Sequence, residues 1–252
     1  MQNDPIKQYH LDVAERVKSY AKNEKLQHAR QIFHDELIKT NYAYNFFWLG
    51  VPIVQEPQDI QAWQEIIWET KPDLIIETGI AWGGSVIFNA SMLALLETCG
   101  EIEHGDVIGI DIEIRPHNLN AISKHPMSKK ITMFEGSSVD ENIISKVATF
   151  AANKKRILVI LDSNHTHEHV LAELKAYTPM VNVGGYCIVA DTGIEDSSDG
   201  MKSDRPWGKG NNPKTAVWDF LKQNKNFEID KNIELKLLLT CAPDGFLKRI
   251  AI

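Results

Sequence analysis

The strongest constraint on the fold is a series of short apolar runs that alternate with longer stretches of helical character. The nearly continuous apolar runs lie at 73–78, 106–111, 130–135, 156–161 and 185–190. Strands that are buried on both faces of a parallel sheet have this composition. Helical stretches fit between them, at 84–97, 117–124, 139–151 and 166–178. Strict alternation of strand and helix predicts an open α/β sheet with right-handed crossovers.

The two ends of the chain depart from this alternation. After a predicted helix at 212–224, two apolar runs at 235–240 and 245–250 are too close for a crossover helix, so we predict an antiparallel hairpin. A mostly parallel seven-stranded sheet ending in such a hairpin is the usual Rossmann-like architecture of class I methyltransferases. The predicted domains are a helical and aromatic N-terminal extension at 1–56 and a ligand-binding domain at 57–252. Within them, residues 6–28 and 58–70 show amphipathic helical patterns, and residues 29–56 look irregular.

Composition limits the classes of partner. The chain has 252 residues and a net charge of −7, with no basic block, which argues against nucleic acid or an anionic membrane surface. Its three cysteines are widely separated and indicate neither a disulfide framework nor a cysteine zinc site. The N-terminus lacks an apolar signal segment, and no apolar run could span a bilayer. We therefore expect a soluble cytoplasmic protein.

Residues 75–85, IIETGIAWGGS, contain the clearest indication of a ligand. A strand ends at Glu77, Gly79 follows, and a loop with Gly83 and Gly84 leads into a helix. Ligands of open α/β sheets bind beyond the carboxyl ends of the strands, where glycines permit a tight turn and a close backbone approach. The segment lacks both the dinucleotide fingerprint and the Gly-Lys of a phosphate loop. An acid here suits a cationic group, so S-adenosylmethionine, with its ammonium and sulfonium, fits well.

The next two strands end in groups that suit the same cofactor. Asp111 ends the second strand, where a carboxylate commonly accepts ribose hydroxyls. The third strand ends in EGSS at 135–138, which is small and polar where an adenine edge would lie. Each feature alone is common, but together they favour S-adenosylmethionine. The predicted cofactor contacts are Glu77, Gly79, Ala81, Trp82, Gly83, Ser85, Asp111, Ser137, Ser138 and Asp162.

A histidine-rich segment, LDSNHTHEHV, follows the fourth strand. Its spacing from His165 to His169 matches the H-x-x-E-H pattern of one class of zinc peptidases. Such motifs bind zinc from within a helix, whereas this helix would begin near Thr166 and leave His165 in the preceding turn. We therefore disfavour a zinc peptidase. The other polar residues have ordinary explanations, as helix caps for Asn164 and Thr166 and as structural or solvent-facing side chains for His167 and His169.

Five segments together resemble one known family. They are PDLIIETGIAWGGS, GIDIEIRPHN, EGSS, LDSNHTHEHV and APDGFLKRI. They are similar to segments of the cephalosporin hydroxylase/rhamnosyl O-methyltransferase family, over about Gly50 to Ile252. The resemblance implies a methyltransferase that uses S-adenosylmethionine and acts on a hydroxyl of a sugar or secondary metabolite. Catechol-type and related methyltransferases often form oligomers, which makes a homo-oligomer plausible.

The strand ends are also similar, more distantly, to those of the metal-dependent catechol-type O-methyltransferases. Those enzymes hold Mg²⁺ with an Asp after the fourth strand and an Asp-Asn pair after the fifth. This likeness implies Asp162 and Asp191 as metal ligands here, with Thr192 as a weaker oxygen ligand. The closer family tends to have an acidic pair at 190–191, and Ala190 departs from it. Mg²⁺ keeps several waters, so few protein ligands are needed.

The same likeness implies a general base. The catechol-type enzymes use a lysine three residues after the fourth-strand Asp, and His165 occupies that position here. A neutral imidazole can take a proton near neutral pH, and a metal eases the loss of that proton from a hydroxyl. Asp162 and the metal would orient the hydroxyl, His165 would deprotonate it, and its oxygen would attack the sulfonium methyl. A purely orienting or structural role for His165 stays open.

Three further points stay open in the sequence. The turn-rich segment 192–213 fits either a lid over the site, with Arg205 and Trp207 as substrate contacts, or a mobile surface loop. The aromatic segment 42–48 fits an acceptor pocket, although core or subunit interface is more usual. The alternative functions are an accessory subunit of a cephalosporin-type hydroxylation or methoxylation system, without transfer activity, and, less well supported, an NAD-dependent oxidoreductase.

Overall fold

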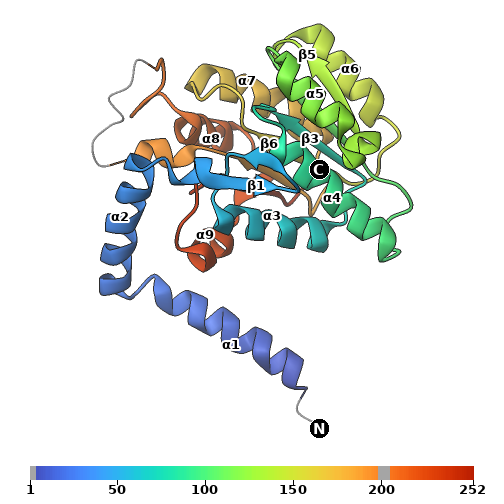
Figure 1. The fold of residues 1–252 in the computed structure, drawn as a ribbon. Helices are drawn as coiled ribbons and strands as arrows, with labels where there is room; N and C mark the ends of the chain where they lie inside the picture. Colours follow the sequence, from blue (N-terminus) through green and yellow to red (C-terminus); the bar gives the residue numbers. More distant parts are fainter. Residues whose placement is uncertain (1–3, 198–204) are drawn as a thin grey trace.

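A seven-stranded sheet forms the centre of the molecule, with helices on both faces (Figure 1). The computed structural model describes residues 4–197 and 205–252. The strands of the sheet are β3 (Leu74–Thr78), β4 (Asp106–Asp111), β5 (Ile131–Glu135), β6 (Ile157–Leu161), β7 (Tyr186–Val189), β8 (Phe227–Ile229) and β9 (Phe246–Arg249). Their order is β5-β4-β3-β6-β7-β9-β8, parallel from β5 to β7, with β9 antiparallel to both neighbours. The predicted fold class is confirmed.

The register of the sheet brings the predicted site residues together. Thr78 of β3 pairs with Leu161 of β6, and Leu161 pairs with Val189 of β7. The strands are parallel, so the residues that follow them leave the sheet at the same edge. The order reverses between β3 and β6, and ligands of open α/β sheets bind at such a switch point.

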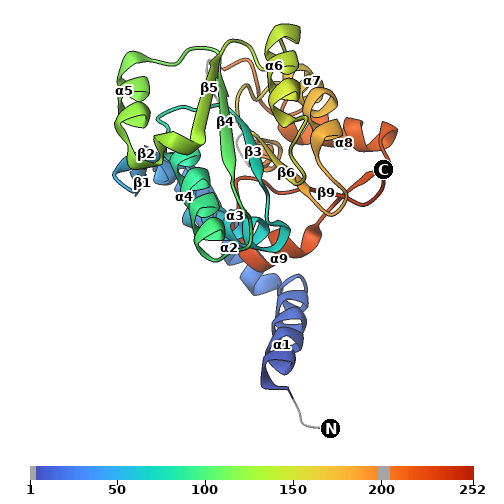
Figure 2. The ribbon, with the colours of Figure 1, turned by 90° about the vertical axis from the view of Figure 1, so that its right-hand side faces the viewer.

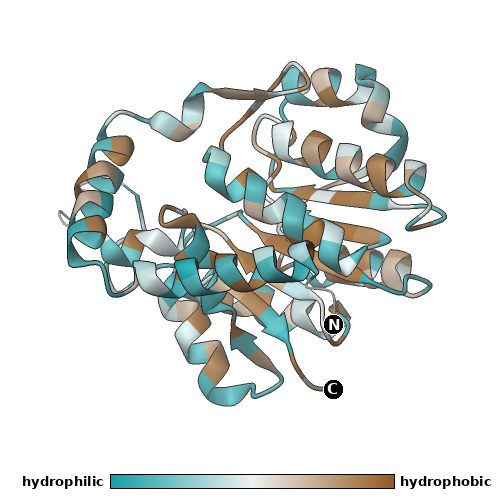
Figure 3. Cartoon of the chain, turned by 90° about the horizontal axis from the view of Figure 1, so that it is seen from below, coloured by the Kyte–Doolittle hydropathy of each residue, from teal (hydrophilic) through white to brown (hydrophobic). Residues whose placement is uncertain are grey.

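Two apolar cores flank the sheet. Neighbouring strand residues such as Ile75 and Ile76 enter different cores because side chains alternate along a strand. One core includes residues of α3 (Pro57–Thr70), α4 (Gly84–Thr98) and α5 (Pro116–Lys124). The other is covered by α6 (Glu141–Ala151), α7 (His167–Tyr177) and α8 (Pro213–Gln223). Figure 3 shows the hydrophobic strands between helices of mixed hydropathy. No helix in the described ranges is long and apolar enough to cross a membrane.

The predicted strand at 235–240 is wrong. Residues Lys231–Leu237 form a helix, α9, and the strand that pairs with β9 is β8 at Phe227–Ile229. The side chain of Asp230 accepts a hydrogen bond from the backbone N–H of Asn232 at 3.1 Å, which caps α9. Ile233 and Leu237, one helical turn apart, pack against the core. The apolar run therefore follows helical rather than strand spacing, while the predicted antiparallel pairing of the last two strands holds.

The N-terminal extension contains two helices rather than the single one predicted at 6–28. α1 (Pro5–Tyr20) extends away from the body of the molecule (Figure 2), and α2 (Glu24–Lys39) runs through residues expected to be irregular. Asn23 separates them, because its side chain accepts the N–H of Leu26 at 3.1 Å and caps α2.

A short hairpin links the extension to the sheet. It consists of β1 (Phe46–Trp48) and β2 (Val51–Ile53) and follows a 3-10 turn at Tyr42–Asn45. Val51 and Ile53 are buried in the core beside α4, so residues before 57 contribute to the larger domain. We keep the boundary at 56 as a proposal about domain organisation.

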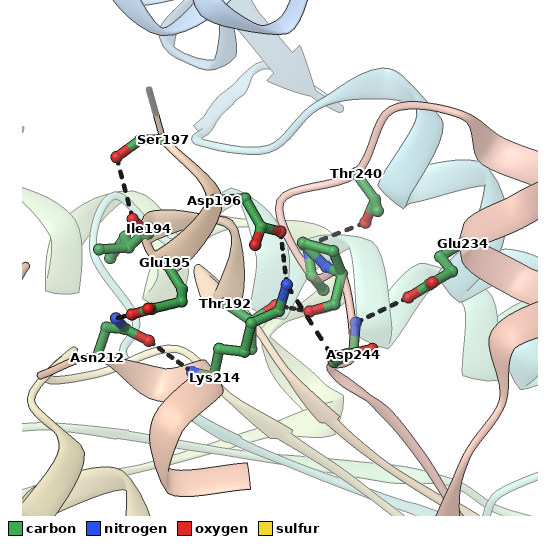
Figure 4. Close-up of polar contacts among 12 residues, drawn as sticks. Thr192, Ile194, Glu195, Asp196, Ser197, Asn212, Lys214, Glu234, Thr240 and Asp244 are labelled. Carbon is green, nitrogen blue, oxygen red and sulfur yellow. Dashed lines mark hydrogen bonds and ion pairs between the residues drawn. The ribbon is translucent and has the colours of Figure 1, made fainter. Parts of the chain in front are cut away.

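The start of the predicted loop at 192–213 is attached to its surroundings (Figure 4). Residues Thr192–Asp196 form a 3-10 helix. The Nζ atom of Lys214, in the first turn of α8, lies 2.5 Å from Oδ2 of Asp196. Glu195 accepts a hydrogen bond from the side chain of Asn212. These contacts anchor both sides of the segment, while 198–204 lie outside the described residues.

Candidate active site

A cavity of about 910 Å³ lies at the carboxyl edge of the parallel strands. One part of its wall is the glycine turn after β3 together with the ends of β4 and β5. Another part comes from the N-terminal extension and from Arg205 and Trp207. Small-molecule sites usually occupy roughly 300–1,000 Å³, so this cavity has room for a cofactor together with a small acceptor.

Most of the predicted cofactor residues line this cavity. They are Gly79, Ala81, Trp82, Gly83, Ser85, Asp111, Ser137, Ser138 and Asp162. Gly79 has a φ of +89°, and a Cβ there would lie 1.9 Å from the carbonyl oxygen of Asp162, so only glycine fits. Gly84 serves packing as well, because a Cβ there would lie 2.3 Å from the carbonyl oxygen of Pro52. From the sequence we predicted only that Gly84 lets the backbone approach a ligand closely.

Asp111 shapes the glycine turn as well as lining the cavity. Its Oδ2 accepts the backbone N–H groups of Ile80 at 2.9 Å and Ala81 at 3.2 Å. Its Oδ1 accepts the N–H of Glu113 at 3.2 Å. The end of β4 therefore holds the turn that follows β3.

Glu77 is bonded to α4 and is not among the residues that line the cavity. The hydroxyl of Ser85 donates to its Oε1, and the amide of Asn89 donates to its Oε2 at 2.7 Å. Glu77 is 1% exposed, and burial raises its pKa to about 7. Each carboxylate oxygen of Glu77 thus accepts a hydrogen bond from within the protein, and its contact with a cationic cofactor group stays a prediction. Ser85, which does line the cavity, connects Glu77 to it.

Three side chains after β6 and β7 form a cluster that could hold a metal ion. One ligand atom each from Asp162, His165 and Asp191 lie within 4.8 Å of one another. Nε2 of His165 is 3.2 Å from Oδ2 of Asp191, and Gln55 donates to Oδ2 of Asp162 at 3.0 Å. Burial, followed by the nearby carboxylates of Asp191 and Glu77, raises the pKa of Asp162 well above its usual range. A divalent cation would offset this concentration of negative charge.

The two predicted ligands after β7 have different environments. Asp191 has a φ of +54°, a left-handed conformation that Asp tolerates better than most residues and that is often found at functional sites. Thr192 is fully buried, and its hydroxyl donates to the carbonyl of Pro243 at 2.6 Å. It is absent from the cavity wall, so the structure gives no support for Thr192 as a metal ligand, and His165 is the third member of the cluster.

The two aromatic and basic residues predicted as substrate contacts lie beside this cluster. The rings of His165 and Trp207 meet edge to face with centroids 4.8 Å apart. The guanidinium of Arg205 lies 5.2 Å from the centroid of Trp207. Both residues line the cavity. Their contact with a substrate stays a prediction.

The zinc-peptidase alternative finds no support in the described ranges. His165 precedes α7, as the sequence analysis expected. The cluster that the described residues form joins His165 to two aspartates rather than to His169. His167 faces α8, with Nδ1 2.9 Å from Oγ1 of Thr215, which is a structural role.

His169 is part of a buried polar group at the cavity wall. Its Nε2 lies 3.0 Å from Oγ of Ser138. The hydroxyls of Ser138 and Ser163 both donate to Oε1 of Glu173, at 2.5 and 2.7 Å. Glu173 is fully buried. A side chain that the sequence analysis set aside as structural or solvent-facing therefore also faces the cavity.

Sequence reasoning missed most of what the N-terminal extension contributes. Tyr42 and Tyr44 line the cavity, whereas Trp48 packs edge to face on Phe88 in the core, so the segment 42–48 serves both purposes. Gln55 and Glu56, which also line the cavity, showed no motif that could have identified them.

The family comparison agrees with this geometry. A family model described as Rhamnosyl O-methyltransferase/CmcI matches residues 40–250. The chain is 28% identical over 220 residues to rhamnosyl O-methyltransferases of Mycobacterium bovis and Mycobacterium tuberculosis, covering 86% of this chain and 82% of theirs. It is 27% identical over 212 residues to the Mycobacterium leprae protein of that name, covering 83% and 86%.

Solved structures share the fold. A CmcI apo-structure superposes with a TM-score of 0.59 at 19% identity, covering 83% of this chain and 78% of the other. A CmcI structure described as Mg-SAM gives 0.56 at 18% identity, covering 82% and 78%. CalS11, described as a TDP-rhamnose 3'-O-methyltransferase, gives 0.52 at 13% identity, covering 99% and 96%.

Proposed function

Because this chain belongs to the Rhamnosyl O-methyltransferase/CmcI family, we propose that it transfers the methyl group of S-adenosylmethionine to a hydroxyl of a sugar or secondary metabolite. The observation that carries the proposal is one cavity that joins the glycine turn to the Asp162, His165 and Asp191 cluster. Mycobacterial relatives are named rhamnosyl O-methyltransferases, which favours a sugar. A cytoplasmic location and a homo-oligomer remain predictions.

The cofactor would bind along the glycine turn. Backbone at Gly79–Gly83 can approach it closely, Asp111 can accept ribose hydroxyls, and Ser137 can contact the adenine edge. Ser85 offers its hydroxyl oxygen to the ammonium end, with its proton donated to Glu77. Glu77 thus acts through Ser85. This arrangement leaves the space beside His165 for the acceptor.

A divalent ion fits the residues present. The carboxylates of Asp162 and Asp191 are hard oxygen ligands, which Mg²⁺ prefers, so they would hold the ion and leave the imidazole available. When bound, the ion would lower the pKa of the acceptor hydroxyl. A related structure is described as containing Mg and SAM, which supports the binding of Mg²⁺ and S-adenosylmethionine in this chain.

The chain's own residues then account for proton transfer. One ring nitrogen of His165 is held by Asp191 at 3.2 Å, so the other can accept the proton of the acceptor hydroxyl. The oxygen attacks the methyl carbon, the sulfur–methyl bond breaks, and S-adenosylhomocysteine leaves. Asp191 stabilises the imidazolium that forms. Alignment of oxygen, carbon and sulfur in the cavity is the main contribution of the site.

Two measurements test the proposal. Calorimetric titration should show binding of S-adenosylhomocysteine and not of NAD. Incubation with radiolabelled S-adenosylmethionine, Mg²⁺ and a panel of rhamnosides should label a sugar, and EDTA should abolish the labelling. Binding of NAD alone would overturn the methyltransferase assignment. Cofactor binding without transfer to any acceptor would favour the accessory-subunit alternative.

A further inference from the structure

Glu56 presents a buried oxygen that the protein leaves without a partner. The residue stands at the N-cap of α3 and is 8% exposed. An acid at a helix N-cap can accept the first N–H groups of the helix, but the side chain of Glu56 makes no such bond. Within residues 4–197 and 205–252, its Oε2 is buried and has no hydrogen-bond partner. Burying such an oxygen unsatisfied is unfavourable, so a donor from outside the chain is expected.

The neighbouring acid Asp59 shows how the same helix treats a structural carboxylate. Asp59 is fully buried, and both its oxygens are occupied. The hydroxyl of Thr240 donates to Oδ1, and the N–H of Cys241 donates to Oδ2 at 2.9 Å. The fold therefore supplies donors to one buried acid of this segment and none to Oε2 of Glu56. Glu56 is one of the residues that line the cavity.

Glu56 lines the cavity and is not one of the proposed cofactor residues. Gln55, the preceding residue, donates to Asp162 of the cluster at 3.0 Å. Other wall residues contributed by the N-terminal extension, such as Tyr42 and Tyr44, are also distant in sequence from the glycine turn. Glu56 is near the cluster without belonging to it, because the group that fits around one ion contains only Asp162, His165 and Asp191 among the described residues. A direct metal–Glu56 bond is therefore not favoured.

We propose that Glu56 binds a second hydroxyl of a polyhydroxylated acceptor, a sugar ring, while the hydroxyl to be methylated sits at the cluster. This inference rests on the proposed function and specifies the acceptor. A hydroxyl is a donor that satisfies Oε2 without adding charge. A catechol would bring both of its oxygens to the ion and leave Glu56 unsatisfied. A sugar carries hydroxyls in several directions, so one can reach the cluster and another Glu56.

The test compares Glu56→Gln with Glu65→Gln. Glu65 lies on the same helix, is exposed, and is paired with Lys236 outside the cavity. Each protein, saturated with S-adenosylhomocysteine and Mg²⁺, is titrated with methyl α-L-rhamnopyranoside and its monodeoxy analogues. Wild type and E65Q should bind the parent at least about 10-fold more tightly than one of the analogues. E56Q should bind the parent about 10- to 100-fold more weakly and should no longer distinguish it from that analogue.

Affinity for S-adenosylhomocysteine, measured on each variant, separates the outcomes. It should be unchanged in E56Q, which shows that the fold is intact. Equal binding of the rhamnoside by E56Q and wild type would overturn the role of Glu56, and so would a loss that is the same for parent and all analogues. A wild type that binds S-adenosylhomocysteine but no rhamnoside would overturn the sugar assignment. A wild type that does not bind S-adenosylhomocysteine would instead overturn the proposed function.

Discussion

Glu77→Gln should remove a large part of the pH dependence of stability. Burial raises the pKa of Glu77 from 4.5 to about 7, because the charged form loses its hydration in the core. The folded state therefore favours the neutral acid. The contribution of Glu77 to the free energy of unfolding is fully present below about pH 4.5, is lost as the pH rises towards 7, and is absent above about pH 7. A difference of about 2.5 pKa units corresponds to a loss of about 3 kcal/mol across this window.

The glutamine variant should keep the local hydrogen bonds. The introduced carbonyl oxygen can accept the hydroxyl of Ser85. The introduced NH₂ needs an acceptor, and Oδ1 of Asn89 is buried without a partner, so a turn of the Asn89 amide supplies one. The amide does not titrate. In E77Q, the contribution of position 77 to the free energy of unfolding should therefore be nearly the same at every pH.

Urea denaturation from about pH 4.5 to about pH 8 measures the effect. Glu56 and Asp59 also have raised pKa values, about 7 and about 6, so only the difference between wild type and E77Q isolates Glu77. Over this pH range the free energy of unfolding of wild type should fall by about 3 kcal/mol more than that of E77Q. Glu65→Gln, an exposed control, should parallel wild type. Parallel curves for E77Q would refute the assignment of Glu77 as the titrating group. A loss of more than about 10-fold in S-adenosylhomocysteine affinity would support direct cofactor contact instead.

The remaining predictions concern the cluster and the glycine turn. Asp162→Asn should weaken Mn²⁺ binding at least about 10-fold in calorimetry while S-adenosylhomocysteine still binds, and unchanged ion affinity would remove Asp162 from the cluster. His165→Gln should lower kcat about 10²- to 10⁴-fold with cofactor affinity retained; an unaltered kcat would show that His165 is not the base. Gly79→Ala should destabilise the fold by more than about 3 kcal/mol, and Gly100→Ala, with open space at a φ of +74°, by only about 1 kcal/mol. Equal losses in urea denaturation would show that the contact at Gly79 does not matter.

The central sheet was predictable because parallel strands covered on both faces must be apolar throughout. The ends of β6 and β7 were predictable because the apolar runs stop there. The likeness to catechol-type enzymes implied that Asp162 and Asp191 act together, and the pairing of the two strands agrees with it. The helix at Lys231–Leu237 was not, because a short apolar run fits a strand or a buried helix equally well.

The orientation of individual side chains needed the tertiary structure. Glu77 was correctly placed at the end of β3, but nothing in its motif shows that Ser85 and Asn89 would occupy its carboxylate. Thr192 followed Asp191 as an aligned ligand would, yet the left-handed conformation at Asp191 accompanies a buried, inward Thr192. The part of the cavity wall before residue 57 comes from long-range packing, for which sequence periodicity carries no information.

The contribution of that early segment to the cavity has a consequence for how such proteins diversify. The proposed cofactor residues follow the strands of the sheet edge, and another part of the cavity wall is built by residues encoded ahead of β3. We predict that this early segment contributes to acceptor selectivity, so that it can vary while the residues proposed for the chemistry are kept. A chimaera that takes its first 56 residues from a relative with a different substrate should shift preference toward that substrate at unchanged S-adenosylhomocysteine affinity, and an unshifted preference would show that this segment does not set selectivity.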